Sequence, residues 1–373
     1  MNQVAVRAAD LFVIGGGPAG LAAAIAARQH GLEVVVADGA EPPIDKACGE
    51  GLLPDAVAAL ERLGVHVPAN ESWAFRGIRF VTSQLSAEAP FDEGLCGVAV
   101  RRTVLHRLLK EHAQRLGARF LWRTPVTGVS AQGVQFGDRI VRARWIIGAD
   151  GLNSRVRRWV GLEPGRRPRL RYAYRAHFEV RPWTDHMELY WGDRCQGYAT
   201  AVSGTQVCVA LASHDPRLRL MEGLENLPRL GERLRGTKIV SRERGALTGN
   251  RKLSRVCREN VALIGDASGT VDAITGAGLR LAFEQATLLA ECLESGDLSR
   301  YQEEHPKLAL RTRLMANLML TLEGRPNLQG RTLRAFRRRP QVFRRLLDFH
   351  IGGSTPLHLV GNGLSLGWDL LTA

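Results

Sequence analysis

The chain has 373 residues, of which 45% are hydrophobic and 24% are charged, a balance that excludes a disordered chain and suits a soluble globular protein with two domains. Its formal net charge is +14, but no nucleic-acid-binding motif accompanies the charge, so we expect no nucleic-acid partner. No segment reads as a transmembrane helix, and the six cysteines lack zinc-site spacing, so we expect a cytoplasmic protein with reduced thiols and no metal.

The first predicted element is a buried strand at residues 11–14, which runs into a glycine-rich turn and then into an alanine-rich helix at 21–27. Gly15 would allow the tight bend, Gly17 would let the backbone approach a pyrophosphate, and Gly20 would let the helix pack closely on the strand. Free backbone N–H groups and the helix dipole would face the phosphates, so the turn predicts a nucleotide site. The whole turn reads Gly15, Gly16, Gly17, Pro18, Ala19 and Gly20.

A second predicted strand, at residues 33–37, ends in Asp38. An acidic side chain at this distance from the glycine turn would accept hydrogen bonds from a pair of ribose hydroxyls. The two features together predict a dinucleotide site. An ordinary turn followed by a surface aspartate is the alternative.

Two further predicted strands run into motifs that contain glycine and aspartate. The strand at 145–148 is followed by Asp150-Gly151, and the strand at 261–264 is followed by Gly265-Asp266. Ligands of open α/β sheets bind at the carboxyl ends of the strands, where a carboxylate can hydrogen-bond sugar or ribityl hydroxyls. The run at 275–279 then begins a helix whose N–H groups could stabilise negative charge on a reduced flavin ring.

Between these motifs the chain alternates apolar and polar residues with the period of β-strands. We expect antiparallel hairpins with turns at Gly192-Asp193 and Ser203-Gly204. The predicted strands are 76–81, 172–180, 187–191, 196–202 and 205–212. Candidate pocket walls are Trp183, Tyr190, Trp191 and Tyr198, and candidate general bases are His177, His186 and His214. Side chains of these types on alternating strands are more often an ordinary part of the sheet, and the sequence does not choose among the three histidines.

The last segment, 301–373, is predicted to be helical, apolar and basic. Arginines at 331–345 interleave with leucines and phenylalanines, which is typical of one or two amphipathic helices broken at Pro340. A solvated basic face and a peripheral contact with a membrane surface or an acidic partner are the alternatives. The segment could also shield an apolar substrate channel.

The glycine turn with Asp38, the Asp150-Gly151 motif and the Gly265-Asp266 motif, in this order, resemble the FAD-dependent oxidoreductases of the para-hydroxybenzoate hydroxylase type. That family includes geranylgeranyl reductases and flavin halogenases. The resemblance implies an α/β fold, in which a Rossmann-like FAD-binding domain carries an inserted, mainly antiparallel β-sheet substrate domain and a helical C-terminal segment. It implies an FAD-binding domain at 1–75, 98–165 and 255–300, a substrate domain at 76–97 and 166–254, and the helical segment at 301–373.

The resemblance also implies roles for single residues in holding FAD. Asp38 would bind the adenosine ribose, Arg102 would contact FAD from a helix start, and Asp150 would bind flavin or pyridine nucleotide. The pyrophosphate would lie on Gly15, Gly17, Pro18, Ala19 and Gly20, the ribityl chain on Gly265 and Asp266, and the flavin ring near Gly276, Ala277 and Gly278. No second glycine turn offers a site for NAD(P)H, which fits a transient reductant.

The chain departs from the family pattern where the reaction is decided. Hydroxylases of the family carry His, Pro and Asn where this chain has Gly269, Ala273 and Arg280, a form that is more similar to the reductases and halogenases. The halogenase Trp-x-Trp-x-Ile-Pro signature is missing, and so is the Tyr-x-Trp-x-Phe-Pro motif of geranylgeranyl reductases.

The loop at 46–54 resembles the Cys-Gly-x-Gly loop of the reductase branch and contains Cys48 and Glu50. We expect it near the flavin edge. A carboxylate beside an apolar flavin pocket could relay a proton, so Glu50 and Cys48 are the candidate catalytic residues. A loop carboxylate and a packed thiol are the alternative.

The resemblance implies, first, an NAD(P)H-dependent monooxygenase that hydroxylates an apolar or aromatic small molecule through a flavin C4a-hydroperoxide. The alternative is a geranylgeranyl-reductase-like flavin reductase or dehydrogenase that acts on carbon–carbon double bonds of a lipid. A flavin-binding scaffold without catalysis is the third reading.

Overall fold

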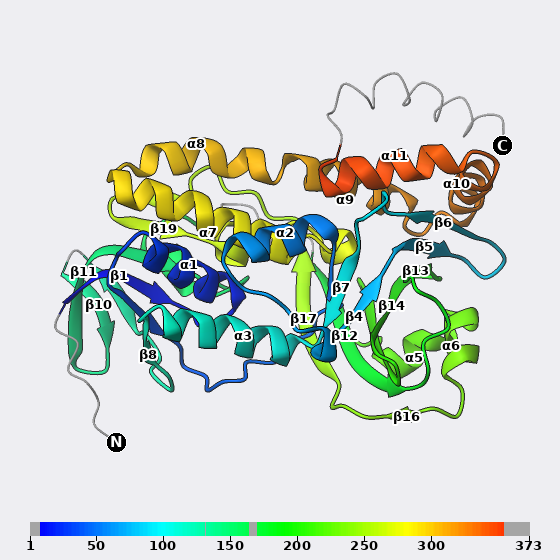
Figure 1. The fold of residues 1–373 in the computed structure, drawn as a ribbon, viewed down its shortest axis with the longest axis horizontal. Helices are drawn as coiled ribbons and strands as arrows, with labels where there is room; N and C mark the ends of the chain where they lie inside the picture. The colour runs from blue at the N-terminus through cyan, green and yellow to red at the C-terminus, as the bar shows by residue number, and fades with distance from the viewer. Residues whose placement is uncertain (1–7, 131, 164–169, 354–373) are drawn as a thin grey trace.

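The first large sheet begins with the strand that precedes the glycine turn. The computed structural model describes residues 8–130, 132–163 and 170–353. In it this strand is β1 (Ala8–Ile14), and both of its neighbours in the sheet pair with it in parallel (Figure 1). This sheet therefore has the arrangement that places ligands at the carboxyl ends of its strands. The described strands run in the order β18 (Cys257–Arg258), β19 (Val261–Leu263), β11 (Arg139–Gly148), β1, β2 (Val34–Ala37) and β8 (Arg119–Leu121), and β10 (Gly133–Phe136) and β9 (Gly128–Ser130) extend β11.

Helix α1 (Pro18–Gln29) follows the turn and is buried from Gly20 to Ala27. Its small alanine side chains let it lie between the sheet and two other helices, α3 (Arg102–Arg115) and α7 (Gly278–Ser295). The predicted helix at 21–27 is confirmed, and it is longer at both ends. The chain also forms the helices α2 (Pro54–Arg62), α4 (Arg155–Trp159) and α8 (Leu298–Leu308). A small third sheet has the strand order β3 (Gly51–Leu52), β7 (Gly97–Val100) and β4 (Ser72–Phe75), and the 3-10 turn Ala69–Glu71 directly precedes β4.

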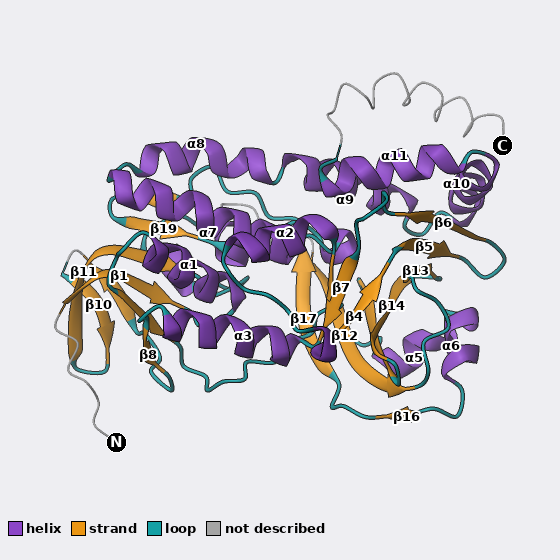
Figure 2. Ribbon diagram, viewed as in Figure 1, coloured by secondary structure: helices purple, strands orange, loops and turns teal. Residues whose placement is uncertain are grey.

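The second large sheet (Figure 2) is mainly antiparallel. It takes its strands from two separated parts of the chain. Its order is β16 (Lys238–Ile239), β12 (Leu170–Glu179), β15 (Gln206–Ser213), β14 (Cys195–Ser203), β13 (Met187–Trp191), β5 (Gly77–Val81) and β6 (Ser86–Pro90), and β17 (Arg244–Gly249) also pairs with β12. The predicted hairpins β13–β14 and β14–β15 are confirmed, but β13 pairs with β5 in parallel.

The two faces of the second sheet have different neighbours. Helices α5 (Leu220–Glu225) and α6 (Pro228–Leu234) pack on one face, around Phe178 and Val209. The other face is covered in part by three C-terminal helices, which are α9 (Leu310–Leu322), α10 (Pro326–Arg338) and α11 (Pro340–Ile351). The rings of Phe336 and Phe343 stack at 4.5 Å, and Phe343 stacks on Phe80 of β5 at 4.8 Å.

The expected α/β class with an inserted, mainly antiparallel sheet and a helical C-terminal segment is therefore confirmed. The predicted break at Pro340 separates α10 from α11. In the part of the chain that the structure describes, none of the helices combines the length and hydrophobicity needed to cross a membrane. Residues 354–373 of the predicted helical segment lie outside the described residues.

Candidate active site

A cavity of about 730 Å³ lies where the two large sheets meet, and its wall includes residues from both. On the first sheet's side it is lined by the glycine turn, Asp38, Arg102 and the residues that follow β11 and β19. On the second sheet's side the lining is largely apolar and comes from Ala173, Met187, Tyr198, Ala210, Leu211 and Ala212. The loop that contains Cys48 and Glu50 closes one wall.

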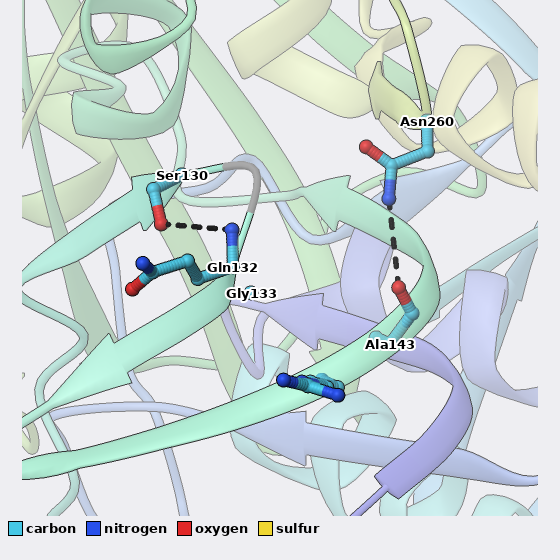
Figure 3. Close-up of a pocket in the computed structure, with 6 residues that line it drawn as sticks. Ser130, Gln132, Gly133, Ala143 and Asn260 are labelled. Carbon is cyan, nitrogen blue, oxygen red and sulfur yellow. Dashed lines mark hydrogen bonds between the residues drawn. The ribbon is translucent and has the colours of Figure 1, made fainter.

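Figure 3 shows a second pocket, of about 390 Å³, beside β9, β10 and β11. Ser130 Oγ accepts a hydrogen bond from the Gln132 N–H at 3.2 Å, and Asn260 Nδ2 donates to the Ala143 carbonyl at 3.5 Å. None of the described residues that line it is a predicted site residue, so we place no function there.

The glycine turn is shaped by contacts that no side chain would allow. Gly15 has φ +114°, in the region that favours glycine, and a Cβ at Gly20 would overlap the Gly15 carbonyl oxygen. A Cβ at Gly17 would meet no atom within 4 Å, although Gly17 lines the cavity. Gly17 is also the N-cap of α1, and Pro18 and Ala19 begin the helix. The first N–H groups of α1 therefore have room for an anionic group beside them.

Three aspartates that the sequence singled out lie on the cavity wall. Asp38 Oδ2 accepts the Gly16 N–H at 2.7 Å, so this carboxylate also holds the glycine turn in shape. Asp150 Oδ2 accepts the Arg155 N–H at 2.7 Å, and Asp150 Oδ1 is buried without a partner among the described residues.

Asp266 lies in a 3-10 turn, Gly265–Ser268, which begins where β19 ends. Its carboxylate pairs with Lys46 Nζ at 3.3 Å. Gly276 and Gly278 flank the buried Ala277 at the start of α7, and a Cβ on either glycine would meet no atom within 4 Å. Both glycines line the cavity, which leaves the backbone there open to a flat ring.

Arg102 begins α3, is 7% exposed and lines the cavity. Burial lowers the pKa of its guanidinium. Its Nη1 is buried and has no hydrogen-bond partner among the described residues. A buried donor of this kind costs free energy unless an acceptor reaches it, and a pyrophosphate is such an acceptor. This orphaned donor and the open glycines fit a dinucleotide with a flat ring.

Glu50 is 3% exposed and has φ +61°, a conformation that side chains rarely adopt. Its Oε1 accepts the Arg102 N–H at 2.9 Å and lies 3.7 Å from Arg175 Nη2. Its Oε2 lies 2.6 Å from Nε2 of His177, a residue of β12. The backbone strain is offset by these contacts, which hold a buried carboxylate at the cavity wall.

Cys48 also lines the cavity. Its Sγ accepts the Glu50 N–H at 3.4 Å, and burial raises the pKa of the thiol. The thiol is therefore protonated and weakly nucleophilic near neutral pH. This favours a packed thiol over a catalytic one.

The candidate pocket-wall residues on the second sheet differ in whether they line the cavity. Tyr198 lines the cavity, and its hydroxyl is buried without a partner among the described residues. Trp183 and Tyr190 both donate to Glu188 at 2.6 Å and do not line the cavity. Trp191 packs on Phe80 instead, so the interpretation of these three as pocket walls is wrong.

Of the three histidines, only His177 reaches a residue of the cavity wall. His186 pairs with Asp185 at 2.7 Å, and His214 bonds the Leu170 carbonyl at 3.1 Å. Sequence reasoning missed Arg175, which pairs with Asp45 at 2.5 Å and approaches Glu50. The signal was available, because Arg171, Arg175 and His177 share one face of β12 at period two.

Comparisons with known proteins agree with this geometry. The model of the FAD binding domain family matches residues 8–213. The menaquinone reductase of Mycolicibacterium smegmatis is 31% identical over 333 residues, which is 80% of each chain. The digeranylgeranylglycerophospholipid reductase of Methanosarcina acetivorans is 27% identical over 324 residues, or 78% of this chain and 77% of that protein.

Two solved structures share the fold. A flavoprotein/dehydrogenase from Cytophaga hutchinsonii has a TM-score of 0.80 at 20% identity and covers 92% of this chain and 93% of its own. A probable FAD-dependent monooxygenase from Pseudomonas aeruginosa has a TM-score of 0.68 at 20% identity and covers 85% and 97%. One fold therefore serves more than one reaction class, and the fold does not identify the reaction.

Proposed function

Because this chain belongs to the FAD binding domain family and is an FAD-dependent oxidoreductase, we propose that it is a reductase that saturates carbon–carbon double bonds in the prenyl chain of a lipid. Both relatives compared above are reductases, and the name of one specifies a geranylgeranyl lipid. The observation that carries the proposal is the composition of the cavity wall. Its sheet side is apolar, and a buried carboxylate with its hydrogen-bonded histidine lies beside it.

This composition suits an alkene. A hydrocarbon double bond offers no polar atom for recognition, so it is held by apolar contact and by the exclusion of water. Ala173, Ala210 and Leu211 supply such a surface, and Met187 adapts to irregular shapes. Reduction also needs a proton on one carbon, and Glu50 is an acidic side chain of the cavity wall that buried partners hold in place.

The residues that would hold FAD line the cavity. The open start of α1 and the unpaired Nη1 of Arg102 would bind the pyrophosphate, Asp38 and Asp266 would accept further hydrogen bonds from hydroxyl groups, and Gly276 would let the ring approach the backbone. Bound FAD supplies hydride chemistry. We propose NAD(P)H as the transient reductant.

The hydroxylase hypothesis has less support from this chain's own residues. Arg280 stands where family hydroxylases carry Asn, and it is not among the described residues that line the cavity. It pairs with Asp55 at 3.1 Å and with Glu284 at 2.5 Å, and it donates to Thr312 at 2.6 Å. Arg280 therefore belongs to a buried polar network that connects α2, α7 and α9.

We also propose a peripheral membrane contact, since a prenyl lipid would reach the cavity from a membrane. Leu310, Leu314 and Leu318 lie on one face of α9 and are 57%, 49% and 38% exposed. The net charge of +14 favours anionic lipid surfaces. Co-sedimentation with anionic vesicles should fall when Leu314 is changed to Asp, and equal binding by this variant would contradict the contact.

The proposed reaction is tested without oxygen. The FAD-loaded protein is reduced, mixed with a geranylgeranyl lipid or a menaquinone, and followed by the return of the flavin absorbance near ~450 nm. We expect reoxidation and a product that has gained two hydrogen atoms. Reoxidation that requires oxygen, with an oxygen atom from labelled O₂ in the product, would instead establish the monooxygenase.

A further inference from the structure

A chain of hydrogen bonds leads from the half-buried Ser241, in the segment between β16 and β17, to the cavity wall. Ser241 Oγ lies 2.8 Å from His177 Nδ1, and His177 Nε2 lies 2.6 Å from Glu50 Oε2. We propose that Ser241, His177 and Glu50 form a proton relay that resupplies a proton donor, Glu50, at the wall of the flavin cavity. The inference rests on the proposed reductase function and names the path by which its proton arrives.

The hydrogen bonds set the direction of the relay. Ser241 Oγ accepts the backbone N–H of His177 at 2.9 Å, so its own hydrogen is available to donate to Nδ1. Arg175 Nη1, which can only donate, lies 3.5 Å from the same Nδ1. Nδ1 is therefore an acceptor, and the ring proton assigned from this network sits on Nε2 and is donated to Glu50.

The burial of Glu50 and His177 limits the paths by which a proton can reach Glu50. His177 is 0% exposed and Glu50 is 3% exposed, whereas Ser241 is half-buried in the segment between β16 and β17. Glu50 Oε1 is held by the Arg102 N–H, so the carboxylate cannot swing out to collect a proton from solvent. When cofactor and substrate fill the cavity that Glu50 lines, His177 offers the hydrogen-bonded path by which a proton returns to it.

The titratable groups that face the His177 ring are the Glu50 carboxylate, the Arg175 guanidinium and the thiol of Cys208 on β15. Burial raises the pKa of Cys208 well above its usual range, so the thiol adds no charge. Asp45 pairs with Arg175 Nη2 at 2.5 Å, and this is the same nitrogen that approaches Glu50.

A metal ion is the other ligand that this cluster suggests, because one atom each of Glu50, His177 and Cys208 lie within 4.8 Å of one another. The contact between Nε2 and Oε2, at 2.6 Å, is that of a hydrogen bond with a proton between the two atoms. Arg175 already supplies a positive charge beside the carboxylate. The geometry therefore favours the relay over a metal.

The step balances in atoms and charge. The cycle starts from the assigned state, with the shared proton on His177 Nε2 and Glu50 as the carboxylate. The double bond gains a hydride, which carries two electrons, and its other carbon takes a proton from Glu50 as Glu50 takes one from His177 Nε2. His177 takes a proton at Nδ1 from Ser241, Ser241 takes one from water and leaves hydroxide, and the ring returns to its Nε2–H tautomer before the next turnover. The hydride donor is the reduced flavin of the proposed function, and the relay requires no other oxidant or reductant.

The kinetic test uses His177→Gln, Glu50→Gln and Ser241→Ala, each in the FAD-loaded protein. General acid catalysis contributes about 10²–10⁴-fold, so single-turnover reoxidation by a prenyl lipid should slow by this factor in the first two variants. Ser241→Ala should be slower than the wild type, and Ser241→Thr, which keeps the hydroxyl, should restore the rate. FAD affinity should stay within about threefold of the wild type in all of them.

The matched control is His305→Gln. His305 is also buried and lies 2.8 Å from a serine hydroxyl, that of Ser268, but it has no contact with Glu50. This variant should keep most of the reoxidation rate. Loss of the rate in His305→Gln as large as that in His177→Gln would show that buried histidines matter only for structure here, and it would overturn the relay.

A readout independent of activity is the tautomer of His177, measured by ¹⁵N NMR of the imidazole ring. The wild type should show the Nε2–H form. In Glu50→Gln, Oε1 stays with the Arg102 N–H, so the new amide faces Nε2 and should switch the ring to the Nδ1–H form. An Nδ1–H ring in the wild type would overturn the proposed direction, as would stoichiometric zinc that is lost in Cys208→Ser.

These outcomes separate the relay from the reductase function. Fast reoxidation of the wild type together with equally fast reoxidation of His177→Gln would overturn the relay and leave the function standing. Absence of reoxidation by prenyl lipids would overturn the function, and the NMR tautomers would still decide whether the proton path has the proposed direction.

Discussion

Alanine substitutions at two glycines of the same turn should have opposite consequences. Gly20→Ala should destabilise the protein, because a Cβ there would overlap the Gly15 carbonyl oxygen and lie 3.2 Å from the Ala149 Cβ. Alanine stabilises a helix interior by about 1 kcal/mol relative to glycine. Moving backbone atoms apart to make room for the added methyl group costs about 1–3 kcal/mol, and the overlap with a carbonyl oxygen places Gly20 at the upper end of this range. We expect a net loss of about 2 kcal/mol in the free energy of unfolding.

Gly17→Ala should leave the stability of the FAD-free protein nearly unchanged. Gly17 has φ −71°, which alanine adopts freely, and its Cβ would meet no atom within 4 Å. That open space is where the pyrophosphate would lie, so the methyl group should weaken FAD binding at least tenfold, or by about 1.4 kcal/mol.

The assay for both variants is thermal unfolding without FAD, followed by titration with FAD. Gly20→Ala should unfold several degrees below the wild type, while Gly17→Ala should unfold with it. Wild-type stability in Gly20→Ala, or wild-type FAD affinity in Gly17→Ala, would refute the division of roles within the turn.

Three further predictions concern buried groups. Burial lowers the folded-state pKa of His350 from 6.5 to about 4, so the unfolded chain binds the proton first and stability falls as pH drops from 6.5 towards 4. At pH 5 this effect costs about 2 kcal/mol in the free energy of unfolding. His350→Gln should therefore lose less stability than the wild type between pH 7.5 and pH 5, as measured by urea unfolding. Asp272→Ala should cost about 3–5 kcal/mol, because it breaks a buried pair with Arg171 at 2.9 Å; a urea midpoint like that of the wild type would contradict this. Because burial raises the pKa of the Cys48 thiol, iodoacetamide at pH 8 should alkylate the exposed Cys96 well before Cys48. Mass spectrometry measures the two alkylation rates, and equal rates would mean that Cys48 is more reactive than its burial implies.

The sequence predicted well those features that depend on local pattern. The turn at Gly15, the strand that ends before Asp38 and the two later glycine–aspartate motifs all depend on short-range spacing, and the structure places them around one cavity. The antiparallel strands and the break at Pro340 follow from alternation and from proline's missing N–H.

Features that depend on pairing between distant segments could not be predicted. The parallel pairing of β13 with β5 joins residues about a hundred positions apart, and local alternation carries no information about it. Glu50 meets His177 because the loop at 46–54 lies against β12 in the fold. The sequence indicated both residues separately as candidates, but only the fold shows that they share a hydrogen bond.

The most direct test of the proposed function is a single turnover of the reduced, FAD-loaded protein with a geranylgeranyl lipid in the strict absence of oxygen. We expect the oxidised flavin spectrum to return and the lipid to gain two hydrogen atoms, with deuterium incorporated into the product when the reaction is run in D₂O. A flavin that stays reduced until oxygen is admitted, with lipid that gains oxygen or remains unchanged, would contradict the proposed function.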